Sequence, residues 1–66
     1  MLKKVMNLKI GEIVKIFLNN GDRLLVGILN KMEKIDKKDL YILSVEKKDS
    51  EIEKVILHYN DYVVTE

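Results

Sequence analysis

Three consecutive residues near the C-terminal end carry side chains suited to binding an unpaired nucleic acid. They are His58, Tyr59 and Asn60. Aromatic rings stack on unpaired bases, and an imidazole or amide N–H can donate to a phosphate or a base edge. An ordinary interpretation stays open beside this one. A histidine near a strand end is commonly solvated or packed, and Tyr59 alternates with Val55 and Leu57 as a core or subunit-interface tyrosine would.

A second candidate site is the most basic stretch of the chain, residues 31–39. Lys34, Lys37 and Lys38 would neutralise backbone phosphates if their side chains point the same way, and binding would then weaken steeply with salt. Acidic residues interleave with the lysines and nearly cancel their charge, so an ordinary solvated loop is the alternative interpretation. These acidic residues are Glu33, Asp36 and Asp39.

The combinations and spacings of residues needed for catalysis or metal binding are missing from the sequence. There is no cysteine and a single histidine, and the acidic residues at 49, 51 and 53 lack the glycine-turned loop of a calcium site. No serine lies in a nucleophile elbow, and the three glycines are never clustered into a phosphate-binding loop. The sequence therefore predicts that the protein is not an enzyme and has no metal or cofactor.

Length and composition fit one small domain covering residues 1–66. Twelve Lys plus Arg against eleven Asp plus Glu give a net charge of +1, so only a local patch can attract nucleic acid. No apolar run approaches the roughly 20 residues that span a bilayer. We expect no membrane partner. The first residues lack the pattern of a secretory signal and cysteine is absent, so the cytoplasm is the default location.

The elements that must position the candidate residues are short β-strands. The clearest signal is Asn20-Gly21 between two apolar runs, which predicts a β-hairpin with a two-residue turn. Both faces of the return strand, residues 23–30, are apolar. Gly27 lies inside this strand, where it would permit a sharp bend or a close approach of another backbone.

Further strands follow from β-branched content and alternation. Leu2, Val5 and Met6 have helical spacing and predict a one-turn N-terminal helix ending near Asn7. Residues 31–39 are predicted as a loop or an extension of the second strand. The five expected strands cover residues 8–18, 23–30, 40–46, about 51–59 and 62–64.

Five short antiparallel strands with apolar side chains on both faces predict an all-β fold, a strongly bent five-stranded barrel of the Sm-like or SH3-like sort. An open sheet of this size would leave one apolar face in water. So short a chain also has little surplus stability, which favours homo-oligomerisation. Unpaired strand edges are expected at residues 62–65 or 40–45, where another subunit would add a strand.

Residues 10–29 resemble the first motif of the Sm-like family, which includes bacterial Hfq. They read IGEIVKIFLNNGDRLLVGIL, an apolar strand followed by Asn-Gly and a second glycine. Residues 55–64, VILHYNDYVV, are similar to the second motif in shape. The sequence departs from the family in the six-residue step from Gly21 to Gly27, where five is usual, and in Leu40, where the family's RNA-contacting Asn would fall.

The resemblance implies an N-terminal helix on a five-stranded bent sheet and rings of six or seven subunits joined by strand pairing. It also implies that single-stranded RNA rich in uridine or adenine binds at loops lining the pore. The alternative from the residues alone is an SH3-like protein-interaction or structural module that binds no nucleic acid. The predicted RNA-binding residues are Lys34, Lys37, Lys38, His58, Tyr59 and Asn60.

Overall fold

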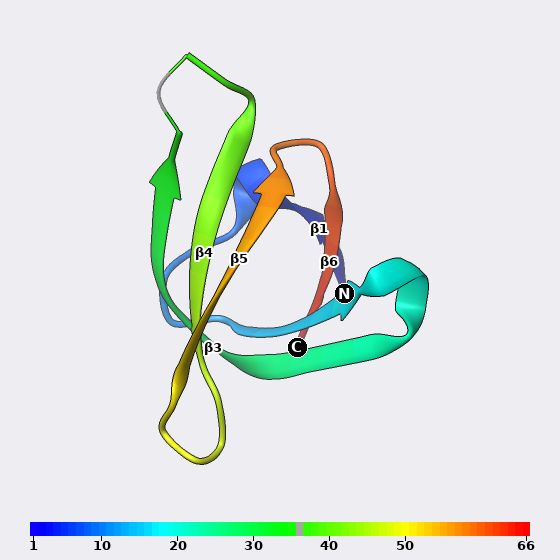
Figure 1. Ribbon diagram of the computed structural model, residues 1–66, viewed down its shortest axis with the longest axis vertical. Coiled ribbons are helices and arrows are strands. Elements are labelled where there is room, and N and C mark those ends of the chain that lie inside the picture. The colour runs from blue at the N-terminus through cyan, green and yellow to red at the C-terminus, as the bar shows by residue number, and fades with distance from the viewer. Residues whose placement is uncertain (36) are drawn as a thin grey trace.

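The computed structural model describes residues 1–35 and 37–66; Asp36 of the basic stretch lies outside the described residues. Over these ranges the chain forms a six-stranded antiparallel sheet in the order β1-β6-β2-β3-β4-β5 (Figure 1). The strands are β1 (Leu2–Lys4), β2 (Ile13–Leu18), β3 (Arg23–Lys34), β4 (Leu40–Glu46), β5 (Ile52–His58) and β6 (Tyr62–Thr65).

The predicted all-β class is confirmed, but the closed five-stranded barrel is wrong. The sheet is open and has six strands among the described residues, because β1 and β5 form its two ends without pairing to each other. The extra strand is β1, which pairs with β6 in the register Leu2↔Val64. The sheet nevertheless bends strongly, and Figure 1 shows β5 crossing the long strand β3.

The predicted N-terminal helix is also wrong. Residues 2–4 are a strand, and only Val5–Asn7 form a single 3₁₀ turn. A helix this short gains too few hydrogen bonds to offset the cost of nucleation. Pairing with β6 instead satisfies the backbone, and it places Val5 fully inside the core. The apolar spacing of this segment thus reflects burial of one side chain and not a helix.

The free edges of the sheet differ from those expected. Both β4 and β6 are interior strands, since β4 lies between β3 and β5, and β6 lies between β1 and β2. The expectation of edge strands at residues 40–45 and 62–65 is therefore wrong. The exposed backbone edges belong to β1 and to the seven-residue strand β5.

The β2–β3 hairpin is confirmed, with a longer turn than predicted. The last strand pair is Leu18↔Arg23, which leaves four residues in the connection. Asn19, Asn20 and Gly21 all have positive φ (52°, 58° and 92°). Asparagine and glycine tolerate this left-handed conformation better than other residues. The Asn-Gly signal therefore located the turn correctly, while the number of turn residues was set by the strand register.

Strand β3 is the longest element, and its bend lets it pair with β2 along one half and β4 along the other. The register shifts between Leu29 and Lys31, and the backbone of β4 passes very close to Gly27. A Cβ at Gly27 would lie 2.2 Å from the carbonyl oxygen of Glu46 and 2.7 Å from Val45 Cγ1. The expectation of a close backbone approach at this glycine is confirmed. The strand continues to Lys34, so the predicted loop is partly a strand extension.

The core fills the inner side of the bent sheet and receives alternate residues from the strands. In β2, Val14 and Ile16 are buried while Ile13 and Phe17 are exposed. Within the described ranges, no helix is both long and apolar enough to cross a membrane. The buried apolar residues are Val5, Leu8, Val14, Ile16, Leu25, Leu29, Leu43, Val45, Val55 and Val63.

Candidate nucleic-acid interface

The two predicted parts of the site meet at one end of the sheet. Leu40 opens β4 and His58 closes β5, and these two residues are paired across the antiparallel ladder. Beyond this pair, the backbone N–H of Tyr59 donates to the carbonyl oxygen of Asp39 at 2.9 Å. We call residues 37–39 the lysine turn and residues 59–61 the C-terminal turn. The hydrogen bond fastens one turn to the other.

All three predicted lysines surround this end. Lys34 is the last residue of β3 and is paired with Tyr41, while Lys37 and Lys38 lie in the lysine turn. The backbone N–H of Lys38 donates to the carbonyl of Ile35 at 3.1 Å, which closes the turn. Each lysine side chain is exposed, and none forms an ion pair with any residue that the structure describes. Their ammonium groups are therefore accessible to an anionic ligand.

The C-terminal turn is organised by His58. Its backbone N–H donates to Asp61 Oδ2 at 2.8 Å, and its ring Nδ1 accepts the backbone N–H of Asn60 at 3.2 Å. An imidazole nitrogen that accepts a hydrogen bond carries no proton, so a neutral His58 has its proton on Nε2. That Nε2–H is a candidate donor to a ligand.

The rings of His58 and Tyr59 form a loosely stacked pair. Their centroids are 4.7 Å apart with an interplanar angle of 37°. Both side chains are half-buried, so neither is a fully packed core residue. The backbone N–H of Met6 donates to the carbonyl oxygen of Tyr59 at 3.2 Å, and the backbone N–H of Val5 donates to the carbonyl oxygen of Asp61 at 2.9 Å. The N-terminal 3₁₀ turn is thus hydrogen-bonded to the C-terminal turn and holds its backbone in place.

The electrostatics of this end are mixed. Lys34, Lys37 and Lys38 contribute positive charge, whereas Asp39 and Asp61 contribute negative charge within the same two turns. Asp61 is engaged as the acceptor for the His58 backbone. The balance favours a ligand that brings both phosphates and stacking bases over a simple polyanion, because stacking supplies affinity that does not depend on net charge.

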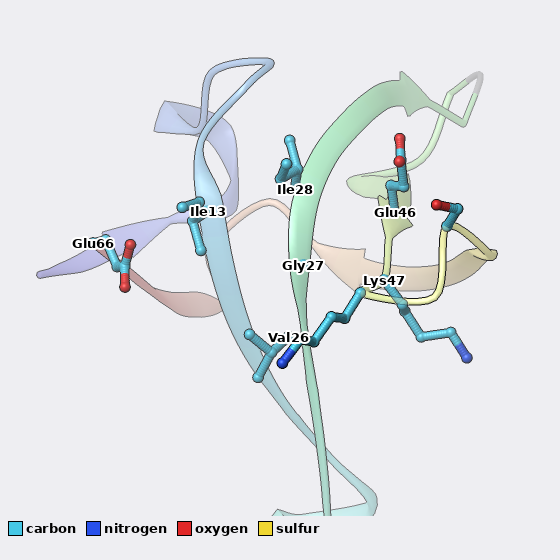
Figure 2. Close-up of a pocket in the computed structure, with 9 residues that line it drawn as sticks. Ile13, Val26, Gly27, Ile28, Glu46, Lys47 and Glu66 are labelled. Atoms are coloured by element: carbon cyan, nitrogen blue, oxygen red, sulfur yellow. The ribbon is translucent and has the colours of Figure 1, made fainter.

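Two other surface features lie outside the six predicted RNA-binding residues. The side chains of Phe17 and Tyr62 are exposed on adjacent strands, and an open cavity lies beside Ile13 and Ile28 (Figure 2). The sequence signal for the cavity was the apolar residues on both faces of residues 23–30, which include Ile28. In the part of the chain that the structure describes, no group of three or more His, Cys, Asp or Glu side chains is arranged to hold a metal ion.

Fold and site together define a small, strongly bent antiparallel β-sheet protein with two polar turns gathered at one end. No family model, curated protein or solved structure matches this chain.

Proposed function

We propose that this chain is an Sm-like, Hfq-like RNA-binding protein that forms a homo-oligomeric ring and binds single-stranded RNA through the lysine turn and the C-terminal turn. The observation that supports it most directly is the hydrogen bond from Tyr59 to Asp39, since it joins two segments that sequence reasoning selected separately. The six selected residues gather at one end of the sheet, where one short RNA segment can contact them together.

Each part of this end has a role in the proposed complex. The His58 and Tyr59 rings offer faces on which unpaired bases stack, and the His58 Nε2–H donates to a phosphate or a base edge. The exposed amide of Asn60 reads a base edge. Lys34, Lys37 and Lys38 contact the RNA backbone, which makes binding sensitive to salt.

The sheet edges supply a route to the proposed ring. A ring built by strand addition needs two different free edges on every subunit, so that each copy pairs with the next. Here those edges are β5 and β1, in place of the interior strands β4 and β6. Strand β5 offers seven residues of unpaired backbone, whereas β1 offers three.

A binding measurement tests the RNA proposal. Fluorescent oligo-U and oligo-A are titrated with the protein at about 50 and 200 mM salt, a range over which phosphate contacts weaken steeply. The triple variant Lys34→Gln, Lys37→Gln, Lys38→Gln should reduce the slope of log affinity against log salt by about 2, at roughly 0.7 per lost contact with a single strand.

The matched control replaces three exposed lysines far from the two turns, Lys15→Gln, Lys48→Gln and Lys54→Gln. This control has the same net charge as the triple variant. Its slope of log affinity against log salt should lie closer to the wild-type slope than that of the triple variant does. No binding of either oligonucleotide at the lower salt contradicts the proposal. Equal slopes of log affinity against log salt for the two triple variants would show that the RNA site lies elsewhere on the surface.

The second candidate function is an SH3-like protein-interaction or structural module that binds no nucleic acid. It is favoured by the many large apolar side chains exposed on β2 and β3, because contiguous apolar patches mark interaction surfaces. Absence of oligonucleotide binding together with self-association through that surface would select this function.

A further inference from the structure

The C-terminal turn contains one hydrogen bond whose existence depends on the protonation of a side chain. The backbone N–H of Asn60 donates to Nδ1 of the His58 ring at 3.2 Å, and this bond requires an imidazole nitrogen that carries no proton. The other hydrogen bonds of the turn join backbone groups or a carboxylate. Among them, the backbone N–H of Asp61 donates to the carbonyl oxygen of His58 at 2.9 Å. A change in the charge of His58 therefore acts first on the Asn60 hydrogen bond.

Histidine is the residue type at this end of the sheet whose charge changes near neutral pH. Imidazole side chains gain a proton between pH 8 and pH 5, a range over which lysine, aspartate and tyrosine normally keep their charge. His58 therefore makes the charge of this end depend on pH. Among the described residues, the titratable groups on the elements around His58 are Lys4, Lys34, Lys37, Lys38, Asp39, Tyr41, Tyr59, Asp61 and Tyr62.

Protonation of His58 would place two donors against each other. An imidazolium Nδ1–H and the Asn60 N–H cannot form a hydrogen bond across the 3.2 Å that now separates the two nitrogens. A charged acceptor lies close by, since Asp61 Oδ2 is 2.8 Å from the backbone nitrogen of His58. A hydrogen bond between imidazolium and carboxylate is stronger than one between neutral groups. Because the His58 side chain is only half-buried, it can turn from Asn60 to Asp61 without opening the core.

We propose that His58 is a pH switch of the C-terminal turn. When the ring gains a proton, it releases the Asn60 N–H and turns to the Asp61 carboxylate. When the ring loses that proton, it accepts the Asn60 N–H again. The protonated state presents one more positive charge and a backbone N–H without a partner inside the turn, so the two states offer different groups to a ligand.

The released N–H is suited to a phosphate oxygen. Backbone N–H groups are common phosphate ligands in nucleic-acid complexes, and a nearby positive charge strengthens such a contact. Asn60 is exposed, and its turn is fastened to the lysine turn by the hydrogen bond from Tyr59 to Asp39. This step rests on the proposed function. It gives the RNA one additional phosphate contact in mild acid.

NMR of the free chain tests the switch without RNA. At pH 8 the nitrogen chemical shifts of the imidazole should show the tautomer with its proton on Nε2. Between pH 8 and pH 5 the Asn60 amide proton should move upfield together with the titration of the ring, because it loses its acceptor. Cross-peaks between the His58 ring protons and the Asp61 β protons should strengthen over the same range.

The matched control is His58→Asn. An asparagine amide oxygen can accept the Asn60 N–H and does not titrate, so the turn is kept while the switch is removed. The Asn60 amide of this variant should keep its chemical shift between pH 8 and pH 5. The imidazole tautomer is measured on the wild-type chain, so that part of the test does not depend on the folding of the variant.

The salt dependence of oligo-U binding tests the phosphate step. For the wild type, the slope of log affinity against log salt should be steeper at pH 5 than at pH 8 by about 0.7, the value for one more phosphate contact with a single strand. For His58→Asn the two slopes should be equal. Its affinity is lower at both pH values because the stacking ring is absent, so only the slopes are compared.

Three NMR results would overturn the switch. They are a neutral ring with its proton on Nδ1, an Asn60 amide that does not follow the titration of the ring, and an equal change of that amide in His58→Asn. Equal salt slopes of the wild type at the two pH values would contradict the phosphate step alone. Absence of oligo-U binding at both pH values would contradict that step together with the proposed function, while the NMR result on the free chain still decides the switch.

Discussion

Arg23 and Glu53 form a bidentate ion pair between two strands that are not neighbours in the sheet. The guanidinium nitrogens of Arg23, at the start of β3, donate to both carboxylate oxygens of Glu53 on β5, while β4 separates the two strands in the sheet order. Lys47 Nζ lies 3.6 Å from the same carboxylate. The ion pair exists only because the sheet bends until the start of β3 meets β5.

We expect this ion pair to make stability depend on pH. The hydrogen bonds from Arg23 hold the pKa of Glu53 below its ordinary value of 4.5, and the charges of Arg23 and Lys47 act in the same direction. A carboxylate whose pKa is lowered on folding stabilises the protein fully above the ordinary value. This contribution is lost as the pH falls below 4.5 and through the lowered pKa.

The variant Glu53→Gln should therefore unfold at a lower temperature than wild type at pH 7, and the difference should shrink as the pH falls below 4.5. Circular dichroism melts from pH 7 to pH 2.5 measure it. Glu51→Gln is the control, because this exposed neighbour has no ion pair among the described residues. A difference between Glu53→Gln and wild type that stays constant over this pH range would contradict the assigned cause.

Gly27→Ala should be strongly destabilising. The added methyl group would lie 2.2 Å from the Glu46 carbonyl oxygen, and backbone atoms of β4 must move to admit it. Overpacking of this kind costs about 1–3 kcal/mol or more. In contrast, Gly21→Asn should cost only about 1 kcal/mol, because nothing lies near the added Cβ and only the strain of a side chain at φ 92° remains, which asparagine tolerates better than most residues. Urea denaturation of both variants measures the contrast.

Leu29→Ala should cost about 2–5 kcal/mol, the usual range for a leucine truncated in a packed core. Leu29 is completely buried where β3 passes from β2 to β4. Ile10→Ala removes a similar volume from an exposed position and should cost less than about 1 kcal/mol. Similar losses of stability in the two variants would show that the inner side of the sheet is not the core.

The variant His58→Asn distinguishes base stacking by the His58 ring from the hydrogen bond that its Nδ1 accepts within the C-terminal turn. Asparagine can accept the Asn60 N–H in place of Nδ1, as in an Asx turn, so the C-terminal turn should keep its fold. Loss of the stacking ring should weaken oligo-U binding by about 1–3 kcal/mol. Titrations with the labelled oligonucleotide and backbone NMR shifts of residues 59–61 report the two effects. Unchanged affinity with an intact turn would remove His58 from the proposed site.

Local sequence signals located most strands because residue preference and alternation act over only a few neighbouring residues. The mainly apolar run at residues 40–46 coincides with β4, and Asn19, Asn20 and Gly21 form a turn because they tolerate positive φ. The alternation in β5 also placed Val55 inside and Ile56 outside. The segments that carry the candidate site were identified in the same way.

Pairing between distant segments was beyond the reach of those signals. The spacing of Leu2, Val5 and Met6 is compatible with a helix, but the unpaired edge of β6 made a strand more favourable there. That pairing made β1 a free edge of the sheet in place of β6, and the pairing of β5 with β4 made β5 the other free edge in place of β4. Edge identity depends on which segments find each other in space, and residue type alone does not encode it.

The amino-acid sequence by itself determined that this chain forms short strands with apolar side chains on both faces, because residue type controls local backbone preference and alternation. Only the tertiary structure decided which face became the core, that Tyr59 meets Asp39, and that Phe17 and the cavity beside Ile13 lie at opposite ends of one exposed surface. The physical reason is that these relationships depend on strand register and on the bend of β3 at Gly27, and both arise from packing between residues far apart in the chain.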